Sequence, residues 1–164
     1  MTYDMKVVRG AERFSANFAM MDYLLAAILE SGVNLLRHRV RPFGPEEDRE
    51  PMEGNLMDCF ASNGGRLVTP EEAMEIAEKV GAALPGWIAA PKVVEPEDVM
   101  MLEVPGEKEG EPSRWVAVER IDLVRGVRGR EAAEIGANEK VAERVRLFIA
   151  FCRKAGTSGG FCVY

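Results

Sequence analysis

The sequence predicts an α+β fold, a helix-rich single domain in which about three main helices pack against a small, mostly antiparallel sheet. Apolar residues recur at helical spacing in three segments, and short strand-like segments lie near both ends of the chain. With 164 residues and 47% hydrophobic content, the chain is long enough to bury one core. We therefore expect one globular domain over residues 1–164, with flexible loops near 42–54 and 105–113.

The N-terminal region predicts a strand followed by a helix. Residues 3–9 alternate in the period of a strand. Asn17 or Ser15 is the expected N-cap of the helix, and Ser31-Gly32 is its expected stop. The apolar stripe of this helix comprises Met21, Leu24, Leu25 and Ile28.

Two later segments, Val33–Val40 and Ile121–Val124, stay undecided between helix and strand, because periodicity does not separate the two for short apolar runs. Residues 42–54 contain three prolines and an acidic run, which is typical of a loop. A short helix is expected over residues 55–61.

The clearest helix start follows a glycine-rich turn and a short extended piece. Thr69 is the expected N-cap, Pro70 occupies the first helical position, and Glu72 at the third completes a capping box. We expect this helix to end near Leu84, because a proline and a glycine follow.

The C-terminal half predicts a hairpin, a helix and a closing strand. Strands are expected over Val99–Val104 and Arg114–Val118. Asn138 is the expected cap of the last helix, which ends at Gly156 before a strand over residues 161–164. The buried stripe of that helix comprises Val141, Val145, Phe148, Ile149 and Cys152.

Two of these segments resemble a group of small, uncharacterised bacterial proteins. They are the N-G…V-T-P-E-E-A helix start over residues 63–73 and the F-C-R…S-G-G-F ending over residues 151–161. The insertion Ala155-Gly156-Thr157 departs from the compact form of that ending. The resemblance covers about a quarter of the chain. It implies a bacterial or phage origin and no assigned activity.

The net charge of −6 is unevenly distributed along the chain. Residues 44–113 carry 17 acidic against five basic residues, whereas the flanking segments are net basic. Two interpretations explain this acidic central segment. Its carboxylates lie in solvated loops, or they form an acidic face that binds a basic partner. The predicted partner-binding residues are Glu46, Glu47 and Asp48. The acidic centre also argues against nucleic-acid binding by the later arginines and Trp115.

The sequence favours a cytoplasmic protein. It opens without a secretory signal pattern, and its longest apolar run, residues 18–29, is too short to cross a bilayer. The three cysteines, an odd number without a C-x-x-C pair, fit a reducing compartment as buried thiols.

No pattern of residues predicts catalysis, a metal site or a cofactor. The chain has one histidine, His38, and its cysteines lack zinc-site spacing. The glycines at 156–160 follow a helix, whereas a phosphate-binding loop opens one. A Cys59–His38 nucleophile pair is weaker than the interpretation of His38 as an exposed residue in a basic segment.

We therefore expect a non-enzymatic protein-binding or regulatory protein of the immunity or inhibitor kind, acting on a protein partner or as a homo-oligomer. The sequence leaves open whether the protein is an enzyme and favours a protein without enzymatic activity. The alternative is a small-molecule binding domain or an unrecognised enzyme with a pocket near His38, Cys59, Trp87 and Trp115.

Overall fold

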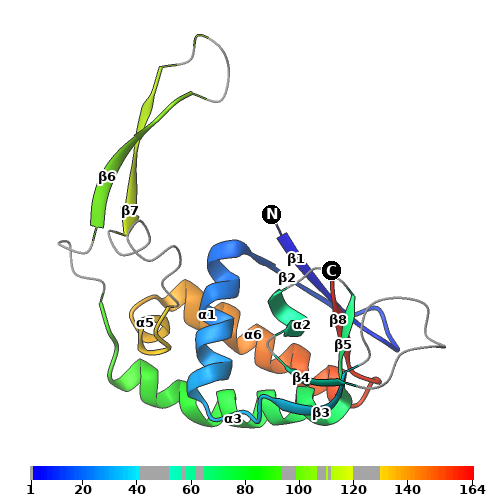
Figure 1. The fold of residues 1–164 in the computed structure, drawn as a ribbon. Helices are drawn as coiled ribbons and strands as arrows, with labels where there is room; N and C mark the ends of the chain where they lie inside the picture. Colours follow the sequence, from blue (N-terminus) through cyan, green and yellow to red (C-terminus); the bar gives the residue numbers. More distant parts are fainter. Residues whose placement is uncertain are drawn as a thin grey trace. The chain divides into compact units, whose positions relative to one another are not determined.

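The computed structural model describes residues 2–40, 52–56, 58–61, 65–93, 99–106, 110, 112–119 and 130–164. The chain divides into two compact units (Figure 1). Unit 1 comprises Met1–Lys92 and Arg130–Tyr164, and unit 2 comprises Val93–Gly129. The α+β class is confirmed. That residues 1–164 form one domain stays a prediction, because compactness alone does not show independent folding.

Unit 1 contains a four-stranded antiparallel sheet of β1 (Thr2–Val7), β2 (Arg13–Asn17), β5 (Arg66–Val68) and β8 (Phe161–Val163). The strand order is β2-β1-β8-β5, so the last strand of the chain lies between the first and the fifth. The strands expected at both ends of the chain are confirmed. β2 was not predicted, because its two buried residues, Phe14 and Ala16, form too short an alternation.

Three main helices, as predicted, pack beside this sheet: α1 (Phe18–Glu30), α3 (Pro70–Ala89) and α6 (Glu139–Gly156). α3 and α6 share the most extensive helix–helix contact, and α1 crosses both (Figure 1). Unit 1 also contains two four-residue helices, α2 (Asp58–Ala61) and α5 (Ala133–Gly136). The predicted caps are confirmed as Asn17, Thr69 with its capping box, and Asn138.

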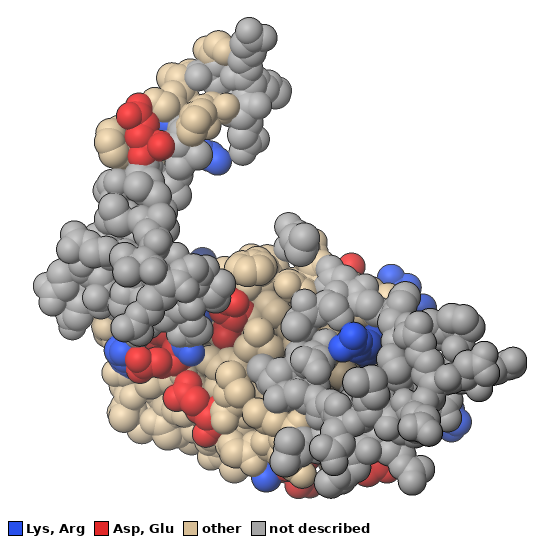
Figure 2. Space-filling view, in the orientation of Figure 1, with Lys and Arg blue, Asp and Glu red and all other residues tan. Residues whose placement is uncertain are grey.

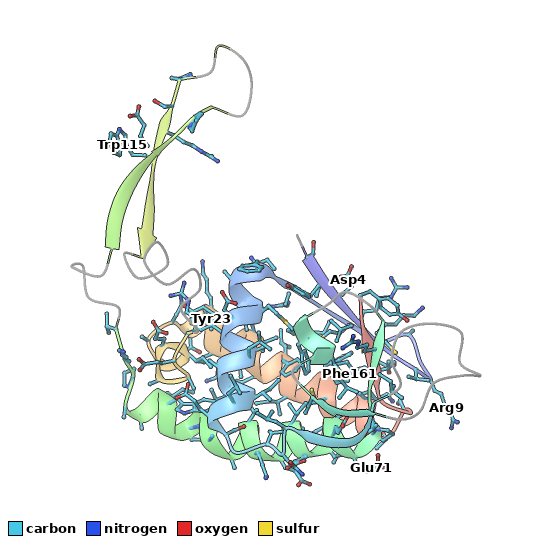
Figure 3. The ribbon with its side chains drawn as sticks, in the orientation of Figure 1. Asp4, Arg9, Tyr23, Glu71, Trp115 and Phe161 are labelled. Atoms are coloured by element: carbon cyan, nitrogen blue, oxygen red, sulfur yellow. The ribbon has the colours of Figure 1, made fainter. Side chains whose placement is uncertain are left out.

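A chain of phenylalanine rings runs through the core of unit 1 and joins the sheet to the helices. Phe14 of β2 lies 5.4 Å from Phe148 of α6, and Phe151 of α6 lies 5.1 Å from Phe161 of β8, between ring centroids. The ring centroid of Phe60 in α2 lies 6.1 Å from that of Phe161 and extends the chain of rings to this helix. Phe161 and its neighbours thus fill the space between sheet and helices (Figure 3).

The end of α3 differs from the prediction. We expected a stop near Leu84, but the helix continues through Pro85 to Ala89. A proline inside a helix costs about 3 kcal/mol, so another contact must hold the last turn. The half-buried Trp87 packs against the core, and Gly136 of α5 lies against its backbone, where a Cβ atom would come 1.9 Å from the Trp87 carbonyl oxygen.

The undecided segment Val33–Val40 is extended at its end. β3 (Leu36–Val40) pairs antiparallel with β4 (Met52–Asn55). Residues 52–54 of the expected loop lie in β4 instead, and residues 42–51 lie outside the described residues. The short helix expected over 55–61 is reduced to α2.

Unit 2 contains the predicted hairpin. β6 (Val99–Val104) pairs antiparallel with β7 (Arg114–Glu119), in a register that places Glu103 opposite Trp115 and Val104 opposite Arg114. The other undecided segment, Ile121–Val124, lies outside the described residues.

Gly160 closes the connection from α6 to β8. Its φ of +85° lies in the left-handed region, and a Cβ atom there would come 2.2 Å from the Val68 carbonyl oxygen of β5. Its N–H donates to the Ala155 carbonyl at 2.8 Å. The turn therefore requires glycine for its backbone angle and for the close approach of two strands.

We expect Gly160→Ala to lower the free energy of unfolding by about 1–3 kcal/mol more than Gly32→Ala. Gly32 has a similar φ of +81°, but no atom lies within 4 Å of the added Cβ. The loss of stability in Gly32→Ala therefore measures only the cost of a side chain in the left-handed backbone conformation. Chemical denaturation of both variants measures the difference. Equal losses would show that the approach to Val68 does not constrain the turn.

Glu75 of α3 ties the segment after α1 to this helix. Its Oε1 accepts the Asn34 N–H at 3.0 Å and lies 2.9 Å from Lys79 Nζ, which also donates to the Gly32 carbonyl at 2.6 Å. The hydrogen bond from Lys79, and then that from Asn34, lowers the pKa of Glu75 below its usual 4.5. Since the folded pKa is depressed, this stabilisation is present above the unfolded pKa and is lost as pH falls through the folded pKa.

We expect Glu75→Gln to destabilise the protein at neutral pH by about 0.5–1 kcal/mol, because the pair is half-exposed. The difference from wild type should shrink as pH falls below the usual glutamate pKa. Unfolding free energies measured over an acid-to-neutral series test this, with Glu78→Gln, an exposed glutamate on the same helix, as the control. A difference that does not vary with pH would contradict the assignment.

Candidate functional site

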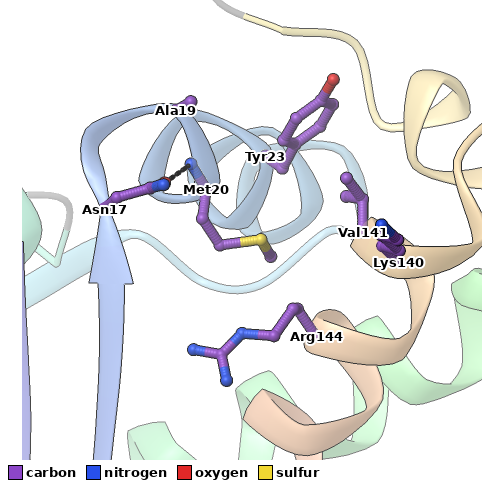
Figure 4. A pocket seen from close by; sticks show the side chains of 7 residues that line it. All are labelled: Asn17, Ala19, Met20, Tyr23, Lys140, Val141 and Arg144. Carbon is purple, nitrogen blue, oxygen red and sulfur yellow. Dashed lines mark hydrogen bonds between the residues drawn. The ribbon is translucent and has the colours of Figure 1, made fainter.

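A pocket of about 300 Å³ lies where the first turns of α1 and α6 meet (Figure 4). Both walls come from helix starts. The lining residues are Asn17, Ala19, Met20 and Tyr23 from the α1 side, and Lys140, Val141 and Arg144 from α6.

Asparagine caps fix both walls of this pocket. The Asn17 side chain accepts the Met20 N–H at 2.8 Å, and the Asn138 side chain accepts the N–H groups of Lys140 and Val141 at 3.1 and 3.3 Å. Both helices therefore begin at the pocket and direct the positive ends of their dipoles to it.

The α6 wall carries two cations one helical turn apart. Arg144 donates from Nη2 to the Ser15 carbonyl oxygen, and its guanidinium lies 4.6 Å from the centroid of the Phe14 ring. Lys140 is exposed. Within the described part of the chain, neither cation forms an ion pair with a carboxylate.

The α1 wall is mainly apolar. Met20 is only 8% exposed, and Tyr23 is half-buried beneath Arg130, whose guanidinium carbon lies 5.0 Å from the ring centroid. Figure 4 shows the Met20 side chain extending across the gap towards α6. The pocket thus places an apolar wall beside a cationic one.

A second candidate surface lies on the hairpin of unit 2. Trp115 is 63% exposed, far more than is usual for tryptophan. The register pairs Trp115 with Glu103 across the hairpin, and both side chains are exposed. This surface therefore places an apolar ring beside a carboxylate.

The predicted partner-binding residues Glu46, Glu47 and Asp48 lie outside the described residues. On the face shown in Figure 2, the described side chains include both acidic and basic groups rather than one sign of charge. The acidic interaction surface therefore stays a prediction.

Of the four residues of the predicted pocket, Cys59 and Trp87 lie at opposite ends of α3. Cys59 lies near β5, beside the start of α3, and Trp87 lies in its last turn, about 25 Å away at 1.5 Å per residue. Trp115 belongs to unit 2, and His38 is in β3, where its side chain is not described. Local patterns do not predict which residues meet in space, and here they grouped Cys59 with Trp87, which lie at opposite ends of α3.

Two of the three cysteines lie in the core, and Cys162 of β8 is half-buried. Cys59 and Cys152 are fully buried, and burial raises the pKa of Cys152 well above its usual value. A thiol of this kind stays protonated and is a poor nucleophile. Among the described residues, no three histidine, cysteine or acidic side chains gather as metal ligands, and no helix is long and apolar enough to cross a membrane.

The α1–α6 pocket was not predicted from the sequence. Val141 was expected in the buried stripe of the last helix, and Asn17 and Asn138 were expected only as caps. The one available signal was that two asparagine-capped helices carry Met20 and Lys140 in their first turns. That signal does not indicate that the two helix starts meet.

Comparisons with models of protein families, with curated proteins and with solved structures found no match for this chain. The resemblance drawn from the helix start and the C-terminal segment therefore stays a prediction.

Proposed function

We propose that the protein is a non-enzymatic protein-binding protein that contacts its partner through the β6–β7 hairpin. The observation that carries the proposal is the 63% exposure of Trp115 on a two-stranded sheet. Aromatic residues and methionine are enriched in protein interfaces, and tryptophan is among the commonest residues that dominate binding energy.

The charge beside Trp115 defines the kind of partner. The exposed Glu103 is paired with Trp115 across the hairpin, so this face presents a carboxylate next to the ring. A matching surface has an apolar patch bordered by lysine or arginine. Two copies of the chain joined through this face would bring acidic residues together, which favours a different, basic protein over self-association.

The predicted acidic residues Glu46, Glu47 and Asp48 belong to the same proposal. An acidic segment attracts a basic partner over a range of about 8 Å at physiological ionic strength. It therefore speeds encounter, whereas Trp115 supplies contact area once the proteins meet.

A cytoplasmic location and a bacterial or phage origin accompany this function as proposals. The location is supported by the three cysteines, which are free thiols. The origin depends on the sequence resemblance alone.

We expect Trp115→Ala to weaken the complex with a basic partner by at least about 2 kcal/mol, or roughly thirtyfold in Kd. The partner is first recovered by capture with the tagged chain and then purified. The Kd of wild type and of each variant is measured by calorimetric titration with the purified partner. Separately, the fluorescence of Trp115 is followed in a Trp87→Phe background, where Trp115 is the sole tryptophan. Its emission should shift to shorter wavelength on binding, and added salt should weaken the complex.

The matched control is Leu147→Ala, which removes another exposed apolar side chain, 47% exposed on α6 in unit 1. It should leave the affinity unchanged. Equal losses for both variants, or emission that does not shift with a bound partner, would contradict binding by the hairpin. A shift that depends only on the protein's own concentration would replace the basic partner with a second copy.

A further inference from the structure

We infer that the pocket between α1 and α6 binds a small organic acid with an apolar body. Met20, Tyr23 and Val141 contact that body, and Lys140 and Arg144 bind its carboxylate. This site lies in unit 1 and is independent of the hairpin.

The size of the pocket limits the ligand. A volume of about 300 Å³ lies at the lower end of the range of roughly 300–1,000 Å³ that ligand pockets span. It suits a single aromatic ring or a short aliphatic chain and is too small for a nucleotide. Met20 has a flexible side chain that adapts to different apolar shapes.

The position of Arg144 suits it to hold a carboxylate. The Ser15 carbonyl and the Phe14 ring fix the guanidinium in place, so little conformational entropy is lost when a ligand binds. A guanidinium has five N–H donors in a planar fork, and the bond to Ser15 uses only part of them. The remaining donors match the two oxygens of a carboxylate.

Lys140 adds a second charge on the same wall, one turn before Arg144. The N–H groups of Met20, Lys140 and Val141 already donate to the two asparagine caps. The side-chain cations, rather than those backbone groups, therefore recognise the anion. Among the described residues no carboxylate pairs with Lys140 or Arg144, so a ligand would displace none of the ion pairs found there.

The test is an NMR titration of the full ¹⁵N-labelled chain with phenylacetate, phenylacetamide and acetate. We expect phenylacetate to cause saturable shifts in the amides of residues 17–23 and 138–144. Phenylacetamide lacks the charge and acetate lacks the apolar body, so each should bind at least about tenfold more weakly. The variant Lys140→Gln should weaken phenylacetate binding by about three- to tenfold.

The matched control is Lys6→Gln, which removes an exposed lysine of β1 away from the pocket. It should leave the affinity for phenylacetate unchanged. The same spectra report whether each variant keeps its fold. The proposal is overturned if phenylacetate gives no saturable shifts, if the shifts map elsewhere, or if phenylacetamide binds as tightly. Equal affinities of Lys140→Gln and Lys6→Gln overturn the assignment of the carboxylate site.

Discussion

The insertion of β8 between β1 and β5 is the constraint on which the rest of unit 1 depends. Residues 5–7 and 66–68 do not pair with each other, and both pair with residues 161–163. The ladder continues past β8, where Asp4 and Tyr164 exchange backbone hydrogen bonds of 2.9 and 2.8 Å. Phe161 then projects from β8 into the ring chain that holds α6 and α2. Removing β8 would divide the sheet into a hairpin and a single strand.

The position of α6 follows from that insertion, and the pocket follows from α6. The helix leads directly into β8 through the turn at Gly160, so its C-terminal end is fixed against the sheet. Its N-terminal end therefore lies about 27 Å away along its 18 residues. There it meets the start of α1, whose own position is fixed by β2. The start of α6 is thus set by the sheet at the far end of that helix, and the start of α1 by the strand that leads directly into it.

Local signals predicted those parts of the fold that local energetics decides. Thr69, Pro70 and Glu72 specify the start of α3 because each forms its favourable interaction within four residues. The end of the same helix was predicted wrongly, because Gly136, 50 residues beyond Gly86, supports the turn that Pro85 would otherwise end. The pocket was missed for the same reason. It needs residues 17–23 and 138–144 to meet, and no short pattern contains that contact.

The order of pairing in the sheet also bears on how the chain is made. During synthesis, β1 and β2 emerge first and can form their hairpin at once, but one edge of β1 stays unpaired until residues 161–163 have been translated. The short strand β5 also stays unpaired until β8 has been translated, because β8 is the strand with which it pairs. Pairing over so long a separation is slow, and an open strand edge invites association with other chains. In the nascent chain this edge of β1 therefore stays open until β8 fills the gap between β1 and β5.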